Sequence, residues 1–286
     1  MTATPGTTAD IPQTPEEFLR DFHNRFPGQQ SVGVEASPTA AGRTSYQEFA
    51  DRVAGSRSVL DLGCADGALL EVLAARGAEE LAGVDLSGAE LALARQRPAL
   101  AGADLRQGRA QELPFPDGSF DAVVSHMAFM LMTDVERVVA EAARVLVPGG
   151  ILAVAVGGGA VAGEAMELFL SLARPHFHAA SDAGRRMPKL GDRRARTREG
   201  LDEILAPAGF APVTWESIVL DQSGTPEQVL EFNLSIFYDL VVLEEDQIAR
   251  LRRAFLDDAR ALVSDGRLPC GMRVNIATSR LELRTS

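Results

Sequence analysis

Short runs of apolar residues alternate along the chain with stretches in which apolar residues recur every three or four positions. The apolar runs are typical of buried β-strands and lie at residues 58–62, 81–85, 104–107, 120–125 and 151–156. Helical spacing is present at residues 67–76, 89–97 and 135–146. Strands that alternate with amphipathic helices require a parallel sheet with right-handed crossovers and helices on both faces. The pattern therefore predicts a doubly wound α/β fold.

After residue 159 the pattern changes. Helices are expected at 163–172, 199–208, 226–242 and 245–264, with strands at 212–220 and 272–283 and an irregular basic stretch at 184–198. The fold class predicted for the whole chain is a Rossmann-like, doubly wound, mostly parallel seven-stranded sheet with helical lid insertions. Residues 1–54 are expected to form an N-terminal helical lid. Residues 55–286 are expected to form the Rossmann-like domain, with its insertions near 160–200 and 225–265.

Five helix starts carry the capping-box pattern, in which a Ser or Thr is followed three residues later by Glu or Gln. The predicted pairs are Thr14 with Glu17, Ser45 with Glu48, Ser87 with Glu90, Thr133 with Glu136, and Thr225 with Gln228.

Net charge and cysteine content indicate which binding partners and which cellular compartment to expect. The net charge is −12, which disfavours a duplex nucleic acid or an anionic membrane surface as partner, because both bind through Lys and Arg. Cys64 and Cys270 cannot form a disulfide framework, and no second Cys or His lies at metal-ligand spacing from Cys64, so no metal site is expected. Residues 1–12 lack the pattern of a signal peptide and no apolar window is long enough to span a membrane, so the expected location is the cytoplasm.

The sharpest local feature is the sequence VLDLGCADG at residues 59–67. An apolar strand ends near Asp61, and a turn containing Gly63 and Gly67 opens the next helix. Ligands bind at the carboxyl edge of such a sheet, and glycines allow the backbone to approach them closely. The start of the helix that follows this turn is also expected to offer free N–H groups to a ligand.

The spacing of the glycines disfavours a dinucleotide. A dinucleotide fingerprint has glycines at its first, third and sixth positions, where this chain has Gly63, Ala65 and Ala68. The carboxylate of Asp61 would repel a pyrophosphate and suits a cationic amino group. Asp85 ends the second strand, where a carboxylate can accept both hydroxyls of a ribose.

Together these segments resemble the class I S-adenosylmethionine-dependent methyltransferases, particularly the ubiquinone/menaquinone-biosynthesis-like group of small-molecule enzymes. Five blocks carry the resemblance in the right order across residues 58–156: VLDLGCADG, GVDLS, LPFPDGSFDAVVS, ARVLVPGG and ILAVAV. The resemblance implies S-adenosylmethionine as cofactor. The residues that it assigns to the cofactor are Asp61, Gly63, Cys64, Ala65, Gly67, Asp85, Leu86, Ala110, Gln111 and Ser125.

The resemblance also leaves one contact open. The family usually places an acid opposite the adenine amino group, and Arg109 stands there in this chain. Ala110 and Gln111 are the substitutes considered. The same resemblance implies that His126 lies at the methyl-transfer centre. It is the candidate general base, because an ordinary histidine pKa lies near neutrality.

Several surrounding residues have a plain structural interpretation beside a functional one. The cluster of Met127, Phe129, Met130 and Met132 is either core or an adaptable substrate pocket. The basic stretch 185–198 is either a solvated loop or a lid for an anionic substrate or an acidic carrier protein. Arg43 and Tyr46 are candidates to close over the cofactor.

The function expected from the sequence is methyl transfer to O, N or C of a small, secondary-metabolic molecule. The expected partner is that molecule, free or tethered to a carrier protein, with the enzyme acting as a monomer or homodimer. The alternative is a cofactor-binding enzyme of this fold that catalyses a non-methylating decarboxylation or cyclisation. A non-catalytic cofactor-binding protein and an NAD-dependent oxidoreductase are the weaker alternatives.

Overall fold

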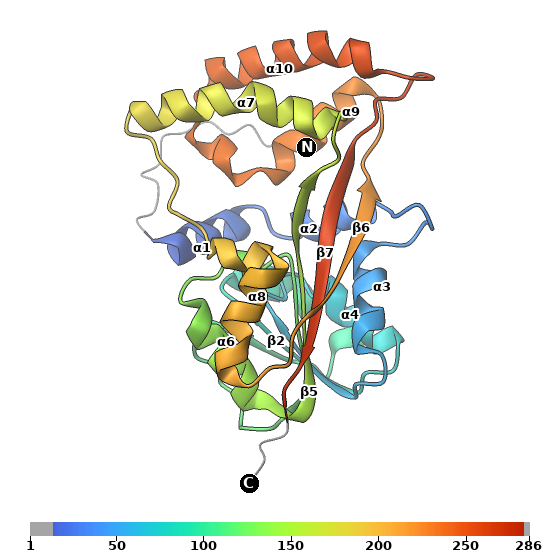
Figure 1. The fold of residues 1–286 in the computed structure, drawn as a ribbon, viewed down its shortest axis with the longest axis vertical. Helices are drawn as coiled ribbons and strands as arrows, with labels where there is room; N and C mark the ends of the chain where they lie inside the picture. Colours follow the sequence, from blue (N-terminus) through green and yellow to red (C-terminus); the bar gives the residue numbers. More distant parts are fainter. Residues whose placement is uncertain (1–13, 283–286) are drawn as a thin grey trace.

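A seven-stranded sheet forms the centre of the computed structural model, which describes residues 14–282 (Figure 1). The strand order is β3-β2-β1-β4-β5-β7-β6. The first five strands in this order are parallel, whereas β7 is antiparallel to both of its neighbours. The strands are β1 (Ser58–Leu62), β2 (Glu80–Asp85), β3 (Asp104–Gln107), β4 (Phe120–His126), β5 (Leu146–Ala160), β6 (Thr214–Asp221) and β7 (Gly271–Arg280).

Helices cover both faces of the sheet and its carboxyl edge. The α-helices are α1 (Pro15–Arg25), α2 (Gln29–Glu35), α3 (Ser45–Ala50), α4 (Ala68–Ala75), α5 (Gly88–Ala94), α6 (Val135–Val145), α7 (Ala165–Asp182), α8 (Arg198–Leu205), α9 (Pro226–Ile236) and α10 (Glu245–Ala259). Short 3-10 helices follow several of them. Two matter below, η3 (Phe129–Leu131) and η6 (Tyr238–Val242).

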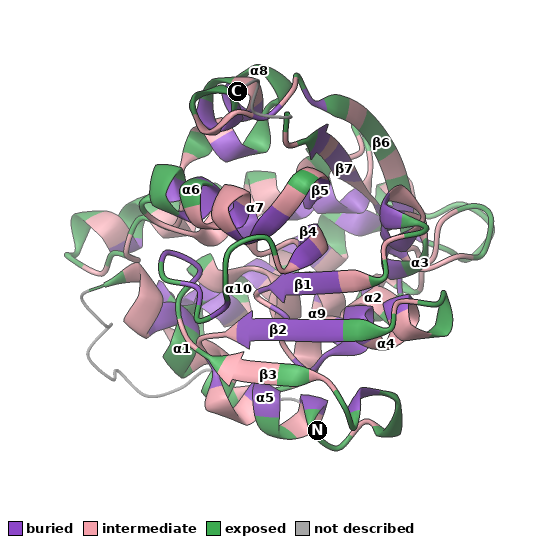
Figure 2. Ribbon diagram, turned by 90° about the horizontal axis from the view of Figure 1, so that it is seen from below, coloured by how far each residue is buried: buried purple, intermediate pink, exposed green. Residues whose placement is uncertain are grey.

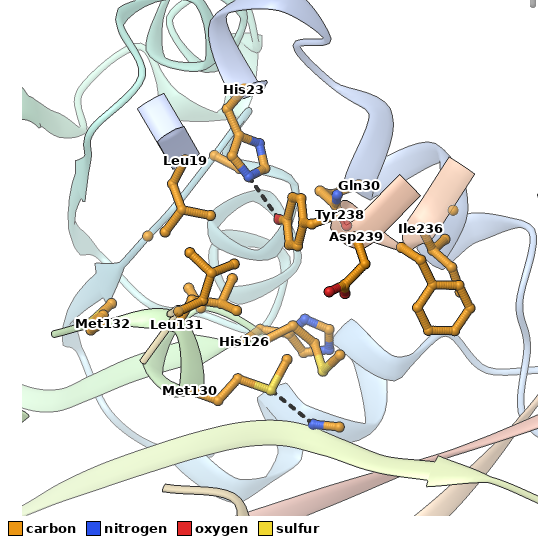
Figure 3. A pocket seen from close by; sticks show the side chains of 18 of the residues that line it. Leu19, His23, Gln30, His126, Met130, Leu131, Met132, Ile236, Tyr238 and Asp239 are labelled. Atoms are coloured by element: carbon orange, nitrogen blue, oxygen red, sulfur yellow. Dashed lines mark hydrogen bonds between the residues drawn. The ribbon is translucent and has the colours of Figure 1, made fainter. Parts of the chain in front are cut away.

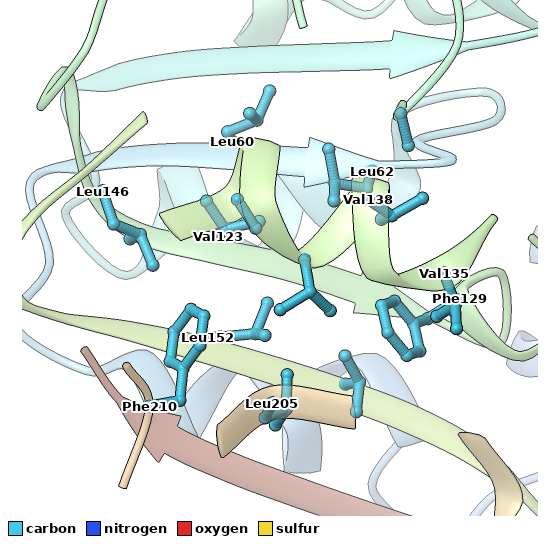
Figure 4. Packing of buried hydrophobic residues seen from close by; sticks show 14 of the residues in the cluster. Leu60, Leu62, Val123, Phe129, Val135, Val138, Leu146, Leu152, Leu205 and Phe210 are labelled. Carbon is cyan, nitrogen blue, oxygen red and sulfur yellow. The ribbon is translucent and has the colours of Figure 1, made fainter. Parts of the chain in front are cut away.

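The two faces of the sheet bury alternate residues of each strand, as a pleated strand requires. Leu60, Val123 and Leu152 pack on one face against α6 and α8 (Figure 4). Val59 and Val124 face the opposite side, where α3 and α4 contribute the core. Figure 2 shows the buried residues continuing along β1 and β2. Burial on both faces explains why these strands are near-continuous apolar runs.

A separate layer, formed by α7, α9 and α10 and called here the helical cap, lies beyond the carboxyl edge of the sheet (Figure 1). Phe169 and Phe255 are fully buried within it, and their rings meet edge to face with centroids 5.9 Å apart. In Figure 1 α1 and α2 lie between the helical cap and the sheet. This arrangement encloses the sheet edge at which ligands bind in such folds.

The predicted fold class is confirmed, and so is the order in which strands and helices follow one another along the chain. Some element bounds differ from those predicted. β5 is longer than predicted because its outer part pairs with β7 beyond residue 156. α7 continues past Pro175 to residue 182, since Ala173 and Ala180 keep its apolar face buried in the helical cap. The expected signal-peptide-free segment at residues 1–12 lies outside the described residues.

Two of the predicted helix caps are wrong. α3 is capped by Thr44 with Gln47, one residue before the predicted pair. At α6 the N-cap is Asp134, because the hydroxyl of Thr133 donates instead to Glu16. The boxes at Thr14 and Thr225 are confirmed. At α5 the Ser87 side chain accepts from the Glu90 N–H, which is half of the predicted box.

Candidate cofactor and substrate site

A cavity of about 940 Å³ lies at the carboxyl edge of the sheet, between the strand ends, α1, α2 and the helical cap. Small-molecule sites generally measure roughly 300–1,000 Å³, so this cavity is large enough for a cofactor and a second molecule. Figure 3 shows part of its lining, with residues from α1, the segment after β4, and η6 facing the same space.

The glycine turn after β1 forms one wall of the cavity. Gly63 has a φ of +76°, and a Cβ at this position would come within 2.5 Å of the Cβ of Ala128, so only glycine fits. Gly63 and Cys64 both donate their N–H groups to the Val84 carbonyl, at 2.8 and 3.2 Å. The N–H of Ala65 donates to Asp85 and that of Gly67 to Cys64. The N–H groups of these four turn residues are therefore used within the fold.

Asp61 lies in the same wall and is 2% exposed. Its Oδ1 atom is buried and has no hydrogen-bond partner among the described residues. Burial, reinforced by the nearby charge of Asp85, raises the pKa of Asp61 to about 8. A buried carboxylate oxygen without a partner is costly, and a bound cation would satisfy it.

Asp85 ends β2 beside the glycine turn. Its Oδ2 accepts from the Ala65 N–H at 2.9 Å and its Oδ1 from the Ser87 N–H at 2.8 Å. Burial raises its pKa, and the two N–H donors oppose that rise. The two N–H groups hold the carboxylate in one orientation, and each oxygen still has a lone pair for a ligand hydroxyl.

Glu16 of α1 supplies a carboxylate that the sequence analysis missed. Its Oε1 accepts from Arg109 at 2.7 Å, from Gln111 at 3.2 Å and from Thr133 at 3.1 Å. Glu16, Ala110 and Gln111 all line the cavity. The resemblance predicts an acidic residue near position 109. In this structure Glu16, which is more than ninety positions away in the sequence, places its carboxylate beside Arg109. No local sequence pattern could reveal this contact.

His23 of α1 joins two other elements above the cofactor side of the cavity. Its Nδ1 lies 3.2 Å from Glu90 Oε1, and its Nε2 lies 3.0 Å from the Tyr238 hydroxyl (Figure 3). Glu90 is fully buried in α5, and Tyr238 begins η6. These bonds tie the N-terminal helix to both the sheet domain and the helical cap, and α1 contributes Glu16, Leu19 and His23 to the cavity wall.

His126 lines the cavity at the end of β4, as predicted. Its Nε2 lies 3.0 Å from Ser45 Oγ, and the rings of Tyr46 and Phe49 pack against it edge to face. Burial lowers the pKa of His126 to about 4. The imidazole is therefore neutral at physiological pH, and the reason given for choosing it, a pKa near neutrality, does not hold in the folded chain.

Gly67 and Ser125 do not line the cavity, in contrast to the other nine predicted site residues. A Cβ at Gly67 would meet Leu100 at 2.6 Å, so packing requires this glycine. Ser125 is fully buried and donates its hydroxyl to the Leu62 carbonyl at 2.8 Å. The structure gives both residues a role in the fold.

The rest of the cavity lining combines apolar and charged side chains. Met127, Met130 and Met132 line the cavity, whereas Phe129 is buried in the core, so the methionine cluster serves both predicted roles. Figure 3 shows the carboxylate of Asp239 directed toward the space between Tyr238 and His126.

The basic stretch is likewise divided between the cavity and the surface. Arg194 pairs with Asp192 away from the cavity. The basic residues that line the cavity are Arg185, which also pairs with Glu244, and Arg186, Lys189 and Arg196.

Within residues 14–282, no helix has the length and apolar character that a membrane crossing requires. Over the same residues, no three His, Cys, Asp or Glu side chains gather as a metal site would need.

The chain has recognisable relatives in its central part. Residues 60–154 match the Methyltransferase domain family. This segment is thus similar to the domains of S-adenosylmethionine-dependent methyltransferases. The matched residues contain β2, β3 and β4, most of β1 and β5, and both strand-end carboxylates, Asp61 and Asp85.

Two curated proteins share this methyltransferase domain at useful identity. The demethylmenaquinone methyltransferase of Thermus thermophilus is 39% identical over 101 residues, which are 34% of this chain and 46% of that protein. The fatty-acid O-methyltransferase of Mycolicibacterium smegmatis is 39% identical over 99 residues, which are 34% of this chain and 36% of that protein. The chain thus corresponds to less than half the length of either relative.

Among solved structures, the crystal structure of the [4+2]-cyclase SpnF superposes with a TM-score of 0.57 and 21% identity, covering 96% of this chain and 100% of that one. At this identity the likeness shows that the methyltransferase domain and its helical additions share a fold with SpnF.

Proposed function

We propose that the chain transfers a methyl group from S-adenosylmethionine to an O, N or C atom of a small molecule. One observation carries the proposal. Two strand-end carboxylates line one large cavity: the buried Asp61, which has an unpartnered oxygen, and the partly buried Asp85, which is held by two N–H groups. A demethylmenaquinone and a fatty-acid methyltransferase share the domain, which supports a small-molecule acceptor.

The residues present fit this cofactor. Asp61 would hold its ammonium group, because the orphaned Oδ1 needs a cationic donor. Asp85 would accept the ribose hydroxyls, and Leu86 would pack on the adenine. Glu16 and Gln111 offer a carboxylate and an amide for the adenine amino group, from the position where the family has an acid.

When bound, S-adenosylmethionine supplies a methyl group on a sulfonium that is already a good electrophile. The chain has to align the acceptor and exclude water, and such alignment is worth roughly 7–11 kcal/mol in well-oriented reactions. α1, α2 and the helical cap contribute residues to the cavity wall and would limit the access of water to a bound acceptor. His126, kept neutral by burial and oriented by Ser45, would position the acceptor and accept a proton from it only weakly.

Incubation with methyl-labelled S-adenosylmethionine and a panel of phenols, carboxylic acids and amines tests the proposal. We expect labelled product and S-adenosylhomocysteine in equal amounts for at least one acceptor class, and a His126→Gln variant that retains cofactor affinity while losing turnover. Conversion of an acceptor without S-adenosylhomocysteine would overturn methyl transfer in favour of a non-methylating reaction on the same scaffold.

A further inference from the structure

Two buried polar side chains of the cavity wall lack partners at a place far from the cofactor carboxylates. Ser37 is 1% exposed and Gln222 is 8% exposed, and both line the cavity. The Ser37 hydroxyl and both amide atoms of Gln222 are buried without a hydrogen bond to any described residue. Each unpaired buried group of this kind costs on the order of 1–3 kcal/mol, so a ligand that pairs with them would bind favourably.

These side chains belong to one spot although 185 positions separate them in the chain. Thr39 and Leu220 form an isolated antiparallel bridge, and the Asp221 N–H donates to the Pro38 carbonyl at 2.8 Å. Ser37 directly precedes Pro38 and Gln222 directly follows Asp221, so this pairing brings the two residues to the same part of the cavity wall.

The cavity-lining residues of the elements next to this part of the wall carry no charge. The lining residues from the neighbouring elements are Gln30, Gly33 and Val34 of α2, Leu220 of β6, Met272 and Val274 of β7, and Phe232 and Ile236 of α9. A ligand charge placed here would be desolvated without compensation, which is strongly unfavourable. The pair therefore suits a neutral group that carries a donor and an acceptor side by side, because the Gln222 amide itself presents one of each.

The spot is also displaced along the sheet from the reaction centre. β6 follows β4 by three places in the strand order, and strands lie about 4.8 Å apart, so the distance between them is about 14 Å. The pairs His126–Ala155, Ala155–Ile276 and Ile276–Glu216 make Glu216 the residue of β6 that is level with His126, so Gln222 lies six residues, roughly 20 Å, further along the strand direction. A molecule that reaches both must be elongated.

We propose that Ser37 and Gln222 form a recognition subsite for a neutral amide-like group at the end of an elongated methyl acceptor, opposite to the end that is methylated. The proposal rests on the methyl transfer proposed above. It names the substrate class as molecules with a carboxamide, lactam or comparable donor–acceptor group joined to an apolar body.

Binding of three matched probes to the protein saturated with S-adenosylhomocysteine tests the subsite. The probes are octanamide, octanoate and 1-octanol, followed by calorimetry. We expect octanamide to bind at least tenfold more tightly than either of the others. Gln222→Met, which keeps an unbranched side chain of similar length, should remove that preference, and Ser37→Ala should reduce it.

Thr39→Val is the matched control. The Thr39 hydroxyl is buried without a partner like that of Ser37, but it does not line the cavity, so the preference for octanamide should persist. The ligand-free Ser37→Ala and Gln222→Met variants should also melt no lower than the parent protein, because the removed groups make no internal hydrogen bond.

Three results would overturn the subsite. They are octanamide binding no tighter than octanoate, a preference unchanged in Gln222→Met, or a drop of several degrees in the melting temperature of the ligand-free variants. The labelling assay above separates this failure from failure of the proposed function. Labelled product without a preference for octanamide would overturn only the subsite, whereas a preference for octanamide without labelled product from any acceptor would overturn only methyl transfer.

Discussion

Replacing Asp61 by asparagine removes a buried carboxylate at nearly constant shape, and it should stabilise the fold while weakening cofactor binding. In the folded protein the pKa of Asp61 is about 8, far above the ordinary value of 3.8. Between these values the folded chain holds a proton that the unfolded chain has released. The free energy of unfolding therefore falls as the pH rises from 4 to 8, by at most about 1.4 kcal/mol for each pH unit.

The Asp61→Asn variant lacks this titration. Its free energy of unfolding, measured by urea denaturation, should depend less on pH, and its advantage over the parent should grow from pH 4 to pH 8. Equal pH slopes for the two proteins would refute the assignment of a raised pKa to Asp61.

Cofactor binding should change in the opposite direction. A cofactor ammonium favours the ionised carboxylate, so binding at pH 7 should release about 0.9 proton from a group of pKa 8. Affinity for S-adenosylhomocysteine should rise from pH 6 to pH 8 and then fall at higher pH, where the ligand's α-amino group loses its proton.

In Asp61→Asn the proton release should disappear, and affinity should drop about 10- to 100-fold, the usual worth of a charge-assisted hydrogen bond. Calorimetry in two buffers of different ionisation enthalpy measures both quantities. Parent-like affinity and proton release in the variant would contradict an ammonium contact at Asp61.

Three further substitutions test other parts of the site. Asp85→Ala removes the proposed ribose acceptor and should weaken S-adenosylhomocysteine binding at least tenfold by calorimetry; unchanged affinity would count against it. Gly63→Ala places an alanine at a positive φ and in close contact with Ala128, so chemical denaturation should show a loss of about 1–3 kcal/mol or more in the free energy of unfolding. Gly77→Ala is the control, because Gly77 also has a positive φ but has open space around it, and this variant should lose less. Glu16→Gln should weaken binding of S-adenosylhomocysteine more than binding of homocysteine, and equal losses would place Glu16 away from the adenine.

Local pattern was sufficient for most of the fold. The buried strands around Asp61 and Asp85 are continuous apolar runs, and the stripe from Val135 to Val145 matches the buried face of α6. Both carboxylates follow strands of one parallel sheet, so their meeting at one edge could be predicted from the order of the elements.

The contacts that α1 and the segment around Ser37 make at the cavity could not be predicted in the same way. Glu16 and His23 reach the cavity only because α1 crosses the sheet edge, and Ser37 meets Gln222 only through one isolated bridge. Such contacts depend on how lid elements pack, and no spacing within the chain encodes them. The pKa of His126 was misjudged for a related reason, since its burial by Tyr46 and Phe49 arises from tertiary packing.

The most direct measurement is a crystal structure of the complex with S-adenosylhomocysteine. The ligand's amino nitrogen should lie within roughly 3 Å of Asp61 Oδ1, and its ribose hydroxyls should lie at a similar distance from the Asp85 carboxylate. A ligand bound in the reverse orientation, or outside this cavity, would contradict the assignment of the two carboxylates.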